Sequence, residues 1–421
     1  MAAQTELLRF STAGSVDDGK STLIGRLLFD AKSIFEDQLS NLERTTKKRG
    51  GQGLDLALLT DGLIAEREQG ITIDVAYRYF ATPKRKFIIA DTPGHEQYTR
   101  NMVTGASTAQ LAIVLVDARK GLLAQSRRHA IIAHLLGIPH LLVAVNKMDL
   151  VNYSEEVFNT VRRDFRAFAA KLNIPHLHFV PISALHGDMV VDRSDNLGWY
   201  KGPTLLDLLE TVDLHSDEPP AWRFPVQLVN RPKSPELIDF RGYMGRIESG
   251  SVRVGDKVVV LPSGLEATVK DIVTLDGSLA VAHAPQSVTL LLAQDIDISR
   301  GDVLVHPGHR PHVSKEFDAM LCWMDTEPLD LARKYLIKHT TNTVKVAFQR
   351  LDYRLNINSV TEETGVTALQ LNDIGRVRLK VQKPMAFDTY KDNRATGSFI
   401  VIDEVSNHTV AAGMIIKQDV L

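Results

Sequence analysis

The chain has 421 residues and a mass of 46.7 kDa; 44% of its residues are hydrophobic and 24% are charged. These values are typical of globular proteins and exclude a disordered or collagen-like chain, and the length predicts about three domains. The 49 Lys and Arg residues nearly balance the 51 Asp and Glu residues. The chain therefore lacks the bulk positive charge that holds nucleic acid or an anionic membrane, and we expect neither as a partner; a local basic patch is the alternative that the overall charge leaves open.

Targeting and redox features predict a cytoplasmic protein. Apolar runs such as Leu111–Val116 and Leu141–Val145 are too short to span a bilayer. The N-terminal residues Met1–Glu6 have neither the basic region nor the apolar core of a signal peptide. Cys322 is the only cysteine, which excludes an intrachain disulfide and a cysteine-based zinc site.

The first half of the chain alternates strand and helix patterns. Strands are predicted at Leu7–Ala13, Leu111–Asp117, His140–Asn146 and Leu177–Ile182, with a hairpin formed by Val75–Phe80 and Lys86–Ala90. Helices are predicted at Ser21–Phe29, Gln125–Leu136 and Glu155–Leu172. This rhythm favours an α/β domain over residues 1–216, built on a doubly wound, mostly parallel sheet that is covered on both faces.

After the linker Asp217–Pro220, short alternating strands separated by glycines dominate. They are predicted at Arg223–Val229, Gly242–Glu248, Lys257–Leu261, Ala267–Val273 and Ser287–Leu292. A second linker, His306–Pro311, precedes another β-rich block that runs to Leu421. We therefore expect two small antiparallel β-barrels, over residues 221–306 and 312–421.

A phosphate-binding loop follows the first predicted strand. Gly14–Ser21 fits the pattern G-x-x-x-x-G-K-[ST], in which backbone N–H groups and the N-terminus of the following helix surround phosphates. Lys20 is placed for the β- and γ-phosphates, and the Ser21 hydroxyl for Mg²⁺. The alternative is a glycine-rich turn with a solvated lysine. The predicted nucleotide-binding residues here are Gly14, Ser15, Val16, Asp17, Asp18, Gly19, Lys20, Ser21 and Thr22.

The run Asn146-Lys147-Met148-Asp149 predicts that the base is guanine. It ends a buried strand, where ligands collect in doubly wound sheets. The Asp149 carboxylate can accept hydrogen bonds from guanine N1–H and N2–H₂, whereas adenine lacks both donors. Lys147 can lie over the base, and Asn146 can join neighbouring loops. The alternative is a solvated loop with a polar strand end.

Another strand ends in Asp91-Thr92-Pro93-Gly94-His95. Asp91 is placed to hold Mg²⁺ through water, and the Gly94 N–H to meet the γ-phosphate. His95 follows at the position of a residue that orients the attacking water, with a surface histidine as the alternative. No arginine finger is evident, so we expect slow intrinsic hydrolysis that a partner accelerates.

Two weaker motifs complete the predicted site. Thr72 is the candidate for a second hydroxyl on Mg²⁺, with an ordinary strand threonine as the alternative. Ser183, Ala184 and Leu185 follow the last strand of the α/β domain and could offer a backbone N–H to guanine O6.

Two further patterns are interpreted as structural. His306-Pro307-Gly308-His309 fits a phosphate-binding pattern of some nucleotidyltransferases, but no helix follows it. The basic run Lys47-Lys48-Arg49 could touch a polyanion, although three charges are typical of a solvated loop.

Longer blocks of sequence resemble one branch of the translation-factor class of GTPases. That branch is the large, GTP-binding subunit of bacterial sulfate adenylyltransferase, the CysN/NodQ family. The resemblance covers the whole chain, and it is carried by residues 14–28, 55–80, 86–108, 245–250, 254–256, 395–399 and 410–413.

The resemblance implies a regulatory GTPase with GTP or GDP and Mg²⁺ as ligands. It implies a CysD-like catalytic small subunit as partner, in a heterodimer or a higher assembly. That partner makes adenosine 5′-phosphosulfate and pyrophosphate from ATP and sulfate, a reaction that GTP hydrolysis drives. Within the site, His95 and Lys20 would be catalytic, Asp17 would support the activated loop, and Val16 and Ile71 would keep His95 from the water until the partner binds.

Two alternatives remain open from the sequence. One is an elongation-factor-type translational GTPase that binds aminoacyl-tRNA, because the fold and motifs are shared. The other is a scaffold locked in the GTP state, which would need a defective Mg²⁺ or water site. Some family members continue into an adenylyl-sulfate kinase domain with its own P-loop; no second P-loop occurs here, so we expect no such activity from these 421 residues.

Overall fold

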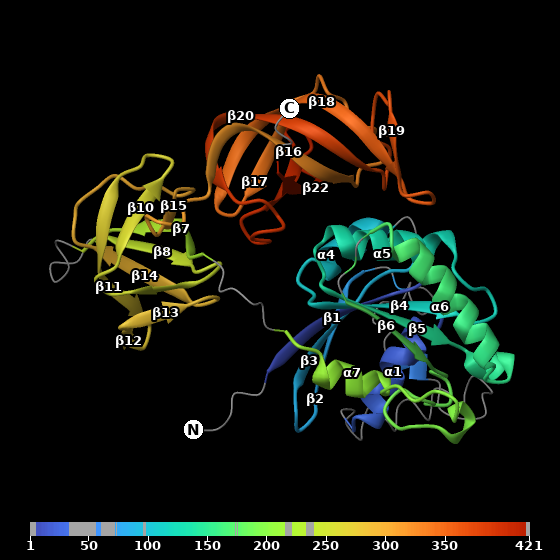
Figure 1. Ribbon diagram of the computed structural model, residues 1–421. Coiled ribbons are helices and arrows are strands. Elements are labelled where there is room, and N and C mark those ends of the chain that lie inside the picture. Colours follow the sequence, from blue (N-terminus) through green and yellow to red (C-terminus); the bar gives the residue numbers. More distant parts are fainter. Residues whose placement is uncertain are drawn as a thin grey trace. The chain divides into compact units, whose positions relative to one another are not determined.

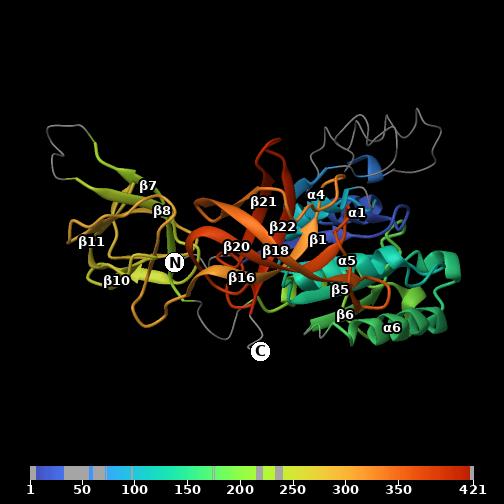
Figure 2. The same ribbon diagram turned by 90° about the horizontal axis from the view of Figure 1, so that it is seen from above.

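The computed structural model describes residues 6–32, 56–59, 72, 74–95, 98–172, 174, 176–214, 221–232 and 240–417. The chain divides into two compact units. One comprises Met1–His215 with Asn356–Thr361, and the other Ser216–Leu355 with Glu362–Leu421. Each unit is described by itself (Figures 1 and 2).

The first unit is built on a six-stranded sheet with the order β2-β3-β1-β4-β5-β6. β2 is antiparallel to β3, and all the other pairings are parallel. The predicted doubly wound, mostly parallel sheet is therefore confirmed. The strands are β1 (Leu7–Ala13), β2 (Ala76–Ala81), β3 (Lys86–Asp91), β4 (Leu111–Asp117), β5 (His140–Asn146) and β6 (His176–Pro181).

Helices cover both faces of this sheet, with α4, α5 and α6 on one side and α1 and α7 on the other (Figure 1). They are α1 (Lys20–Asp30), α4 (Thr99–Ala106), α5 (Ala124–Leu135), α6 (Glu155–Ala169) and α7 (Leu205–Thr211), with 3-10 turns η1 (Leu56–Leu59), η3 (Met148–Val151) and η4 (Asp195–Leu197). None of the described helices is long and apolar enough to cross a membrane.

The ends of the helices are fixed by local side chains. The Ser154 hydroxyl accepts the Val157 N–H at the start of α6. Thr204 and Asp207 form a reciprocal capping box at the start of α7. Such caps satisfy backbone donors that have no partner within a helix, which explains where these two helices begin.

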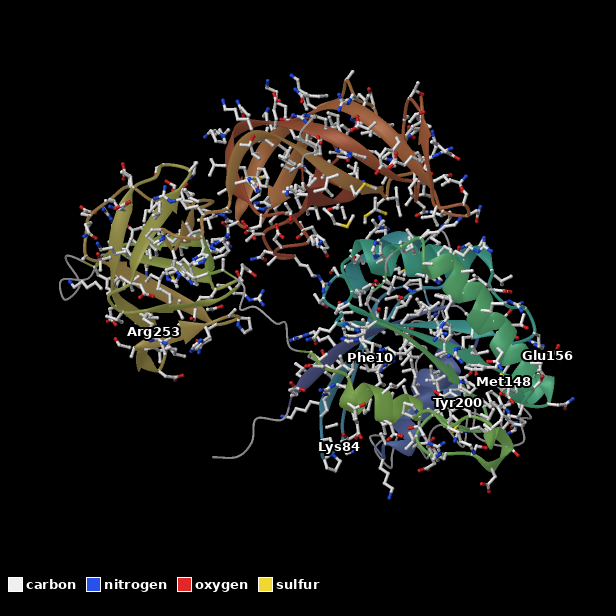
Figure 3. The ribbon with its side chains drawn as sticks, in the orientation of Figure 1. Phe10, Lys84, Met148, Glu156, Tyr200 and Arg253 are labelled. Carbon is white, nitrogen blue, oxygen red and sulfur yellow. The ribbon has the colours of Figure 1, made fainter. Side chains whose placement is uncertain are left out.

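The core of the unit lies along the central strands. Every residue of β4 and β5 is buried, as expected for strands covered on both faces. Phe10 of β1, labelled in Figure 3, packs edge-on against Phe80 and Phe87 of the hairpin β2–β3. This packing fixes β1 against the hairpin, and the loops that follow β1 and β3 carry nucleotide motifs.

The second unit contains two closed antiparallel barrels. In the first, β10-β15-β7-β8-β14-β11 form a ring that the β10–β11 pairing closes, and β12 extends it; β9 and β13 pair separately. In the second, β17-β21-β22-β16-β20-β18 form a ring that the β17–β18 pairing closes, and β19 extends it. Both predicted barrels are therefore confirmed as folds.

The strands of the first barrel are β7 (Arg223–Asn230), β8 (Gly242–Arg246), β9 (Ser251–Arg253), β10 (Lys257–Leu261), β11 (Glu266–Thr274), β12 (Gly277–Ser278), β13 (Val281–His283), β14 (Ser287–Leu292) and β15 (Val303–Val305). Those of the second are β16 (His312–Trp323), β17 (Tyr335–His339), β18 (Asn342–Asn356), β19 (Thr361–Thr364), β20 (Ile374–Phe387), β21 (Ser398–Asp403) and β22 (Thr409–Ile416).

A buried ion pair joins the two barrels. Arg223 donates to both carboxylate oxygens of Asp388, at 2.8 and 2.7 Å, and also to the carbonyl of His309. The His306 ring packs against that of Trp222, with centroids 5.0 Å apart and the planes tilted by 33°, and its Nε2 lies 3.3 Å from Asp256. The H-x-G-H sequence thus lies in the connection between the barrels, in agreement with its interpretation as structural.

Candidate guanine-nucleotide site

The P-loop adopts a backbone that requires its second glycine. Gly19 has φ +90°, and a Cβ there would lie 2.4 Å from the Asn146 side chain. The Asp18 carboxylate accepts the Ser15 N–H at 2.8 Å and so closes the loop on itself. These constraints hold the loop between β1 and α1, where its backbone amides can surround phosphate groups.

Lys20 brings together three predicted residues from distant segments. Its ammonium group donates to the Thr72 hydroxyl at 3.1 Å and lies 3.9 Å from Asp91 Oδ1. All three residues are buried, with exposed fractions of 8%, 7% and 1% for Lys20, Thr72 and Asp91. A cation, a hydroxyl and a carboxylate therefore meet beside the P-loop.

The donor set fits Mg²⁺. Thr72 and Asp91 supply oxygen atoms, and Ser21 follows Lys20 in the first turn of α1. Over the described ranges, no three His, Cys, Asp or Glu side chains form a metal site by themselves. Mg²⁺ in nucleotide sites takes few protein ligands, because phosphates and water complete its coordination. We propose Ser21, Thr72 and Asp91 as its protein ligands.

The loop after β3 packs directly on the P-loop. A Cβ on Gly94 would lie 2.2 Å from the Gly14 carbonyl oxygen, so no other residue fits without a shift of the backbone. The Gln125 side chain of α5 donates to the Gly94 carbonyl at 3.0 Å and anchors the loop. His95, half-buried, follows directly, with its ring centroid 6.0 Å from that of Tyr98.

Asn146 joins three motifs. Its amide nitrogen donates to the Asp18 carbonyl at 2.8 Å, and its amide oxygen accepts the Ala184 N–H at 3.0 Å. The Ser183 hydroxyl donates to Asp149 Oδ1 at 2.7 Å. The P-loop, the end of β5 and the loop after β6 therefore form one hydrogen-bonded unit, although their residues are far apart in sequence.

Lys147 is held in place by an aspartate that sequence reasoning missed. Asp117 ends β4, lies 3.1 Å from the Lys147 ammonium and accepts three hydrogen bonds from Arg119. Burial alone raises the pKa of Asp117, but the hydrogen bonds from Arg119 and Lys147 outweigh it and hold that pKa well below its usual range. Lys147 also donates to the Asp17 carbonyl, so its position is set from two sides.

Arg26 is a second residue that sequence reasoning missed. From α1 it donates to the carbonyls of Ala184 and Leu185, at 3.3 and 2.6 Å. It thereby fixes the loop whose amides we propose for guanine O6. Nothing in the sequence near Arg26 indicates this contact, whereas Asp117 follows a buried strand just as Asp91 does.

The raised pKa of the Asp18 carboxyl group makes the stability of the folded protein depend on pH. Burial raises its pKa from 3.8 to about 6, although the Ser15 N–H opposes the shift. Because the folded state binds this proton more tightly, the contribution is complete below about pH 4 and is lost as the pH rises through about 6. The loss is on the order of 3 kcal/mol.

The Asp18→Asn variant, which carries no charge at this position, is expected to gain stability relative to the parent as the pH rises from about 4 to about 6.5. Urea unfolding followed by helical circular dichroism measures this, because all described helices lie in the first unit. A difference between the two proteins that stays constant over this pH range would contradict the assignment.

Three sequence interpretations cannot be placed. Ile71 of the proposed gate, the basic run Lys47–Arg49 and the linker Asp217–Pro220 lie outside the described residues. Val16, the other gate residue, is 38% exposed on the P-loop.

Comparison with known proteins gives the family. Residues 5–218 match the model of the elongation factor Tu GTP binding domain, and residues 316–416 match the GTP-eEF1A C-terminal domain-like family. Sulfate adenylyltransferase subunit 1 of Chromobacterium violaceum is 58% identical over 98% of this chain and 86% of its own. The protein of the same name from Bacteroides fragilis is 56% identical over 99% of this chain and 87% of its own.

Longer relatives match as well. The bifunctional enzyme CysN/CysC of Mycobacterium tuberculosis is 57% identical over 98% of this chain and 68% of its own length. Together with the fold and the joined nucleotide motifs, these matches show that the chain belongs to the sulfate adenylyltransferase subunit 1 (CysN/NodQ) family, whose GTPase domain is of the elongation factor Tu type.

Proposed function

We propose that the chain is the GTPase subunit of a sulfate adenylyltransferase. Hydrolysis of GTP on this chain drives the formation of adenosine 5′-phosphosulfate and pyrophosphate from ATP and sulfate on a CysD-like catalytic subunit. The observation that carries the proposal is that the predicted guanine-nucleotide motifs are hydrogen-bonded to one another in a chain that matches subunit 1 proteins over nearly its full length.

Guanine recognition falls to Asp149. Its carboxylate can accept N1–H and N2–H₂ of the base, and the Ser183 hydroxyl holds one of its oxygens. Asn146 keeps the P-loop and the loop after β6 in register with Asp149, so the base and the phosphates are positioned together.

Phosphate binding falls to the P-loop amides and Lys20, which stabilise the negative charge that develops on the transferred phosphoryl group. A bound Mg²⁺ would neutralise part of that charge. Lys20, Thr72 and Asp91 already lie together, which supports the assignment of these residues to one phosphate and metal site.

Hydrolysis requires a water molecule placed in line with the γ-phosphate. We propose His95 as the residue that orients it, with Asp17 supporting the loop and Val16 forming part of a gate. The Gly94 backbone packs on Gly14 of the P-loop. A contact between the Gly94 N–H and the γ-phosphate would therefore change the position of the loop that carries His95.

The Ser21→Ala variant is expected to bind GTP more weakly in Mg²⁺ but nearly unchanged in EDTA, because it removes a proposed metal ligand and no phosphate contact. We expect the affinity of Ser21→Ala for GTP in Mg²⁺ to fall by about tenfold or more, as is usual when one metal ligand or its supporting residue is removed. Titration of nucleotide binding against Mg²⁺ concentration measures it, and Ser21→Thr, which keeps the hydroxyl, serves as the control. An unchanged Mg²⁺ dependence in Ser21→Ala would refute the role.

Partner specificity tests the proposal as a whole. The GTPase rate is measured alone, with the catalytic small subunit in the presence of ATP and sulfate, and with ribosomes. Strong stimulation by the small subunit is expected. Stimulation by ribosomes instead would assign the chain to translation and leave only the GTPase site standing.

A further inference from the structure

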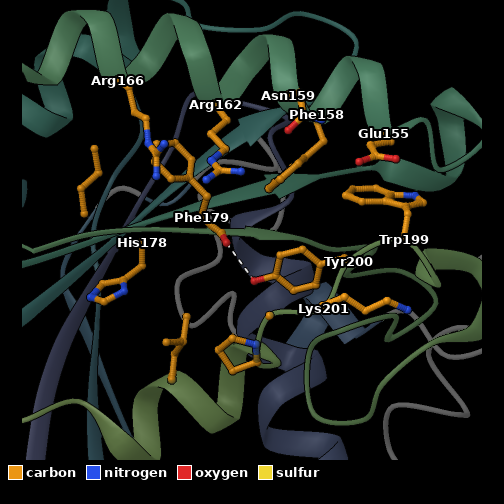
Figure 4. Close-up of a pocket in the computed structure, with 14 residues that line it drawn as sticks. Glu155, Phe158, Asn159, Arg162, Arg166, His178, Phe179, Trp199, Tyr200 and Lys201 are labelled. Carbon is orange, nitrogen blue, oxygen red and sulfur yellow. Dashed lines mark hydrogen bonds between the residues drawn. The ribbon is translucent and has the colours of Figure 1, made fainter.

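A pocket with no assigned role lies on the GTPase unit between α6, β6 and the loop after η4. Its volume is about 430 Å³, within the usual range for small-molecule sites. Figure 4 shows α6 along one side and the segment Trp199–Lys201 on the other. No lining residue belongs to the guanine-nucleotide motifs, so this is a separate site.

Positive charge gathers along one face of α6. Arg162 and Arg166 are one turn apart and both line the pocket, with Arg162 pointing into it (Figure 4). Within the part of the chain that the structure describes, no carboxylate pairs with either guanidinium, whereas the neighbouring Arg163 pairs with Asp164 at 3.2 Å. Glu155, at the far end of α6, is the acidic residue of the lining. The Arg166 guanidinium lies over the Phe179 ring, 5.5 Å from its centroid, a contact that leaves its charge without a carboxylate partner. Two guanidinium groups on adjacent turns that no described carboxylate neutralises suit an anion such as phosphate.

Aromatic rings form the adjoining wall. Trp199 and Tyr200 are both half-buried, and their ring centroids lie 5.4 and 5.9 Å from that of the buried Phe158. Half-buried rings next to cations provide a surface on which a flat heterocycle can stack.

The aromatic wall is held rigidly. The Trp199 indole donates to the Tyr153 carbonyl at 2.9 Å, and the Tyr200 hydroxyl donates to the Phe179 carbonyl at 3.0 Å. Arg193 donates to the carbonyls of Tyr200 and Gly202 at 3.0 and 2.9 Å, which closes the loop that carries both rings. A ligand would therefore meet a wall that is already ordered, which lowers the entropic cost of binding.

We propose that this pocket is a second nucleotide site, which takes a mononucleotide with its phosphate on Arg162 and Arg166 and its base against Trp199 and Tyr200. The ring wall and the volume favour a nucleotide over a bare oxyanion, and the two guanidinium groups favour it over an uncharged heterocycle. The proposal does not rest on the function proposed above, because none of its residues takes part in GTP binding.

The test uses the full chain saturated with GDP, so that the P-loop site is filled, and AMP and ADP as probes. Tryptophan fluorescence reports on the pocket, since Trp199 is half-buried while Trp222 and Trp323 are 2% and 1% exposed in the barrels. We expect a saturable change with AMP or ADP that Trp199→Phe abolishes. Arg162→Gln should weaken binding about tenfold or more, and Arg166→Gln likewise, because each removes a charge-assisted contact.

Arg163→Gln is the matched control, since it removes the same charge from the same helix outside the pocket, and its affinity for AMP should equal that of the parent. Four results would overturn the proposal: no saturable change at millimolar AMP or ADP; equal binding in Arg162→Gln; inorganic phosphate binding as tightly as AMP, which would indicate a bare anion site; or Arg162→Gln weakening only the association with the small subunit, which would indicate a protein contact.

Discussion

Asp149→Asn is expected to lower the affinity for GTP and GDP by roughly a hundredfold or more and to create binding of xanthosine triphosphate. The carboxylate can accept two hydrogen bonds from guanine, and contacts to a charged group are worth about 1.5–3 kcal/mol each. An amide has one acceptor and one donor. It therefore matches xanthine, which keeps N1–H but carries a carbonyl at C2.

Equilibrium titration with fluorescent guanine and xanthine nucleotides measures this exchange of specificity. The gain of xanthine binding is its own control, because an unfolded variant would bind neither base. Guanine affinity that stays within a few-fold of the parent would contradict the role of Asp149, and loss of both bases would show that the contact with Ser183 is needed for folding instead.

His95→Ala is expected to abolish the partner-stimulated hydrolysis of GTP while the affinity for GTP stays nearly unchanged. A residue that orients the attacking water acts in the transition state, so its removal should lower the rate by about 10²–10⁴-fold. The structure places His95 directly after Gly94, which packs on the P-loop, and not in the segment Asn146–Asp149 proposed for base recognition.

Single-turnover hydrolysis with the small subunit present, together with nucleotide titration, separates the two effects. His95→Gln serves as a graded control, because glutamine orients water in other GTPases, and it should retain more activity than His95→Ala. An equal loss of GTP binding and hydrolysis in His95→Ala would contradict the assignment.

The accuracy of the predicted strand and helix bounds depends on how clearly each element's burial is written in its sequence. The bounds of β1, β4 and β5 match the sequence prediction. For β4 and β5 the reason is that apolar runs with polar ends leave one placement for a strand buried on both faces. The helices α4 and α7 were missed. At eight and seven residues they are too short to show a helical period clearly.

The residues of the candidate site also fall into two groups, those that the sequence predicts and those that only the structure reveals. Motifs that are contiguous in sequence, such as Gly14–Ser21 and Asn146–Asp149, could be predicted because each carries its own local geometry. Supporting contacts such as those of Arg26 and Gln125 could not, since Arg26 reaches a carbonyl 158 residues away and Gln125 one that is 31 residues away. Their effect comes from tertiary packing, which leaves no local pattern.

The most direct test of the central claim measures adenosine 5′-phosphosulfate in the reconstituted complex of this chain with the small subunit, ATP and sulfate. We predict that the product accumulates beyond its uncoupled equilibrium while GTP is hydrolysed, and that a non-hydrolysable GTP analogue or His95→Ala returns it to that equilibrium. Product that reaches the same level with and without GTP hydrolysis would contradict the account.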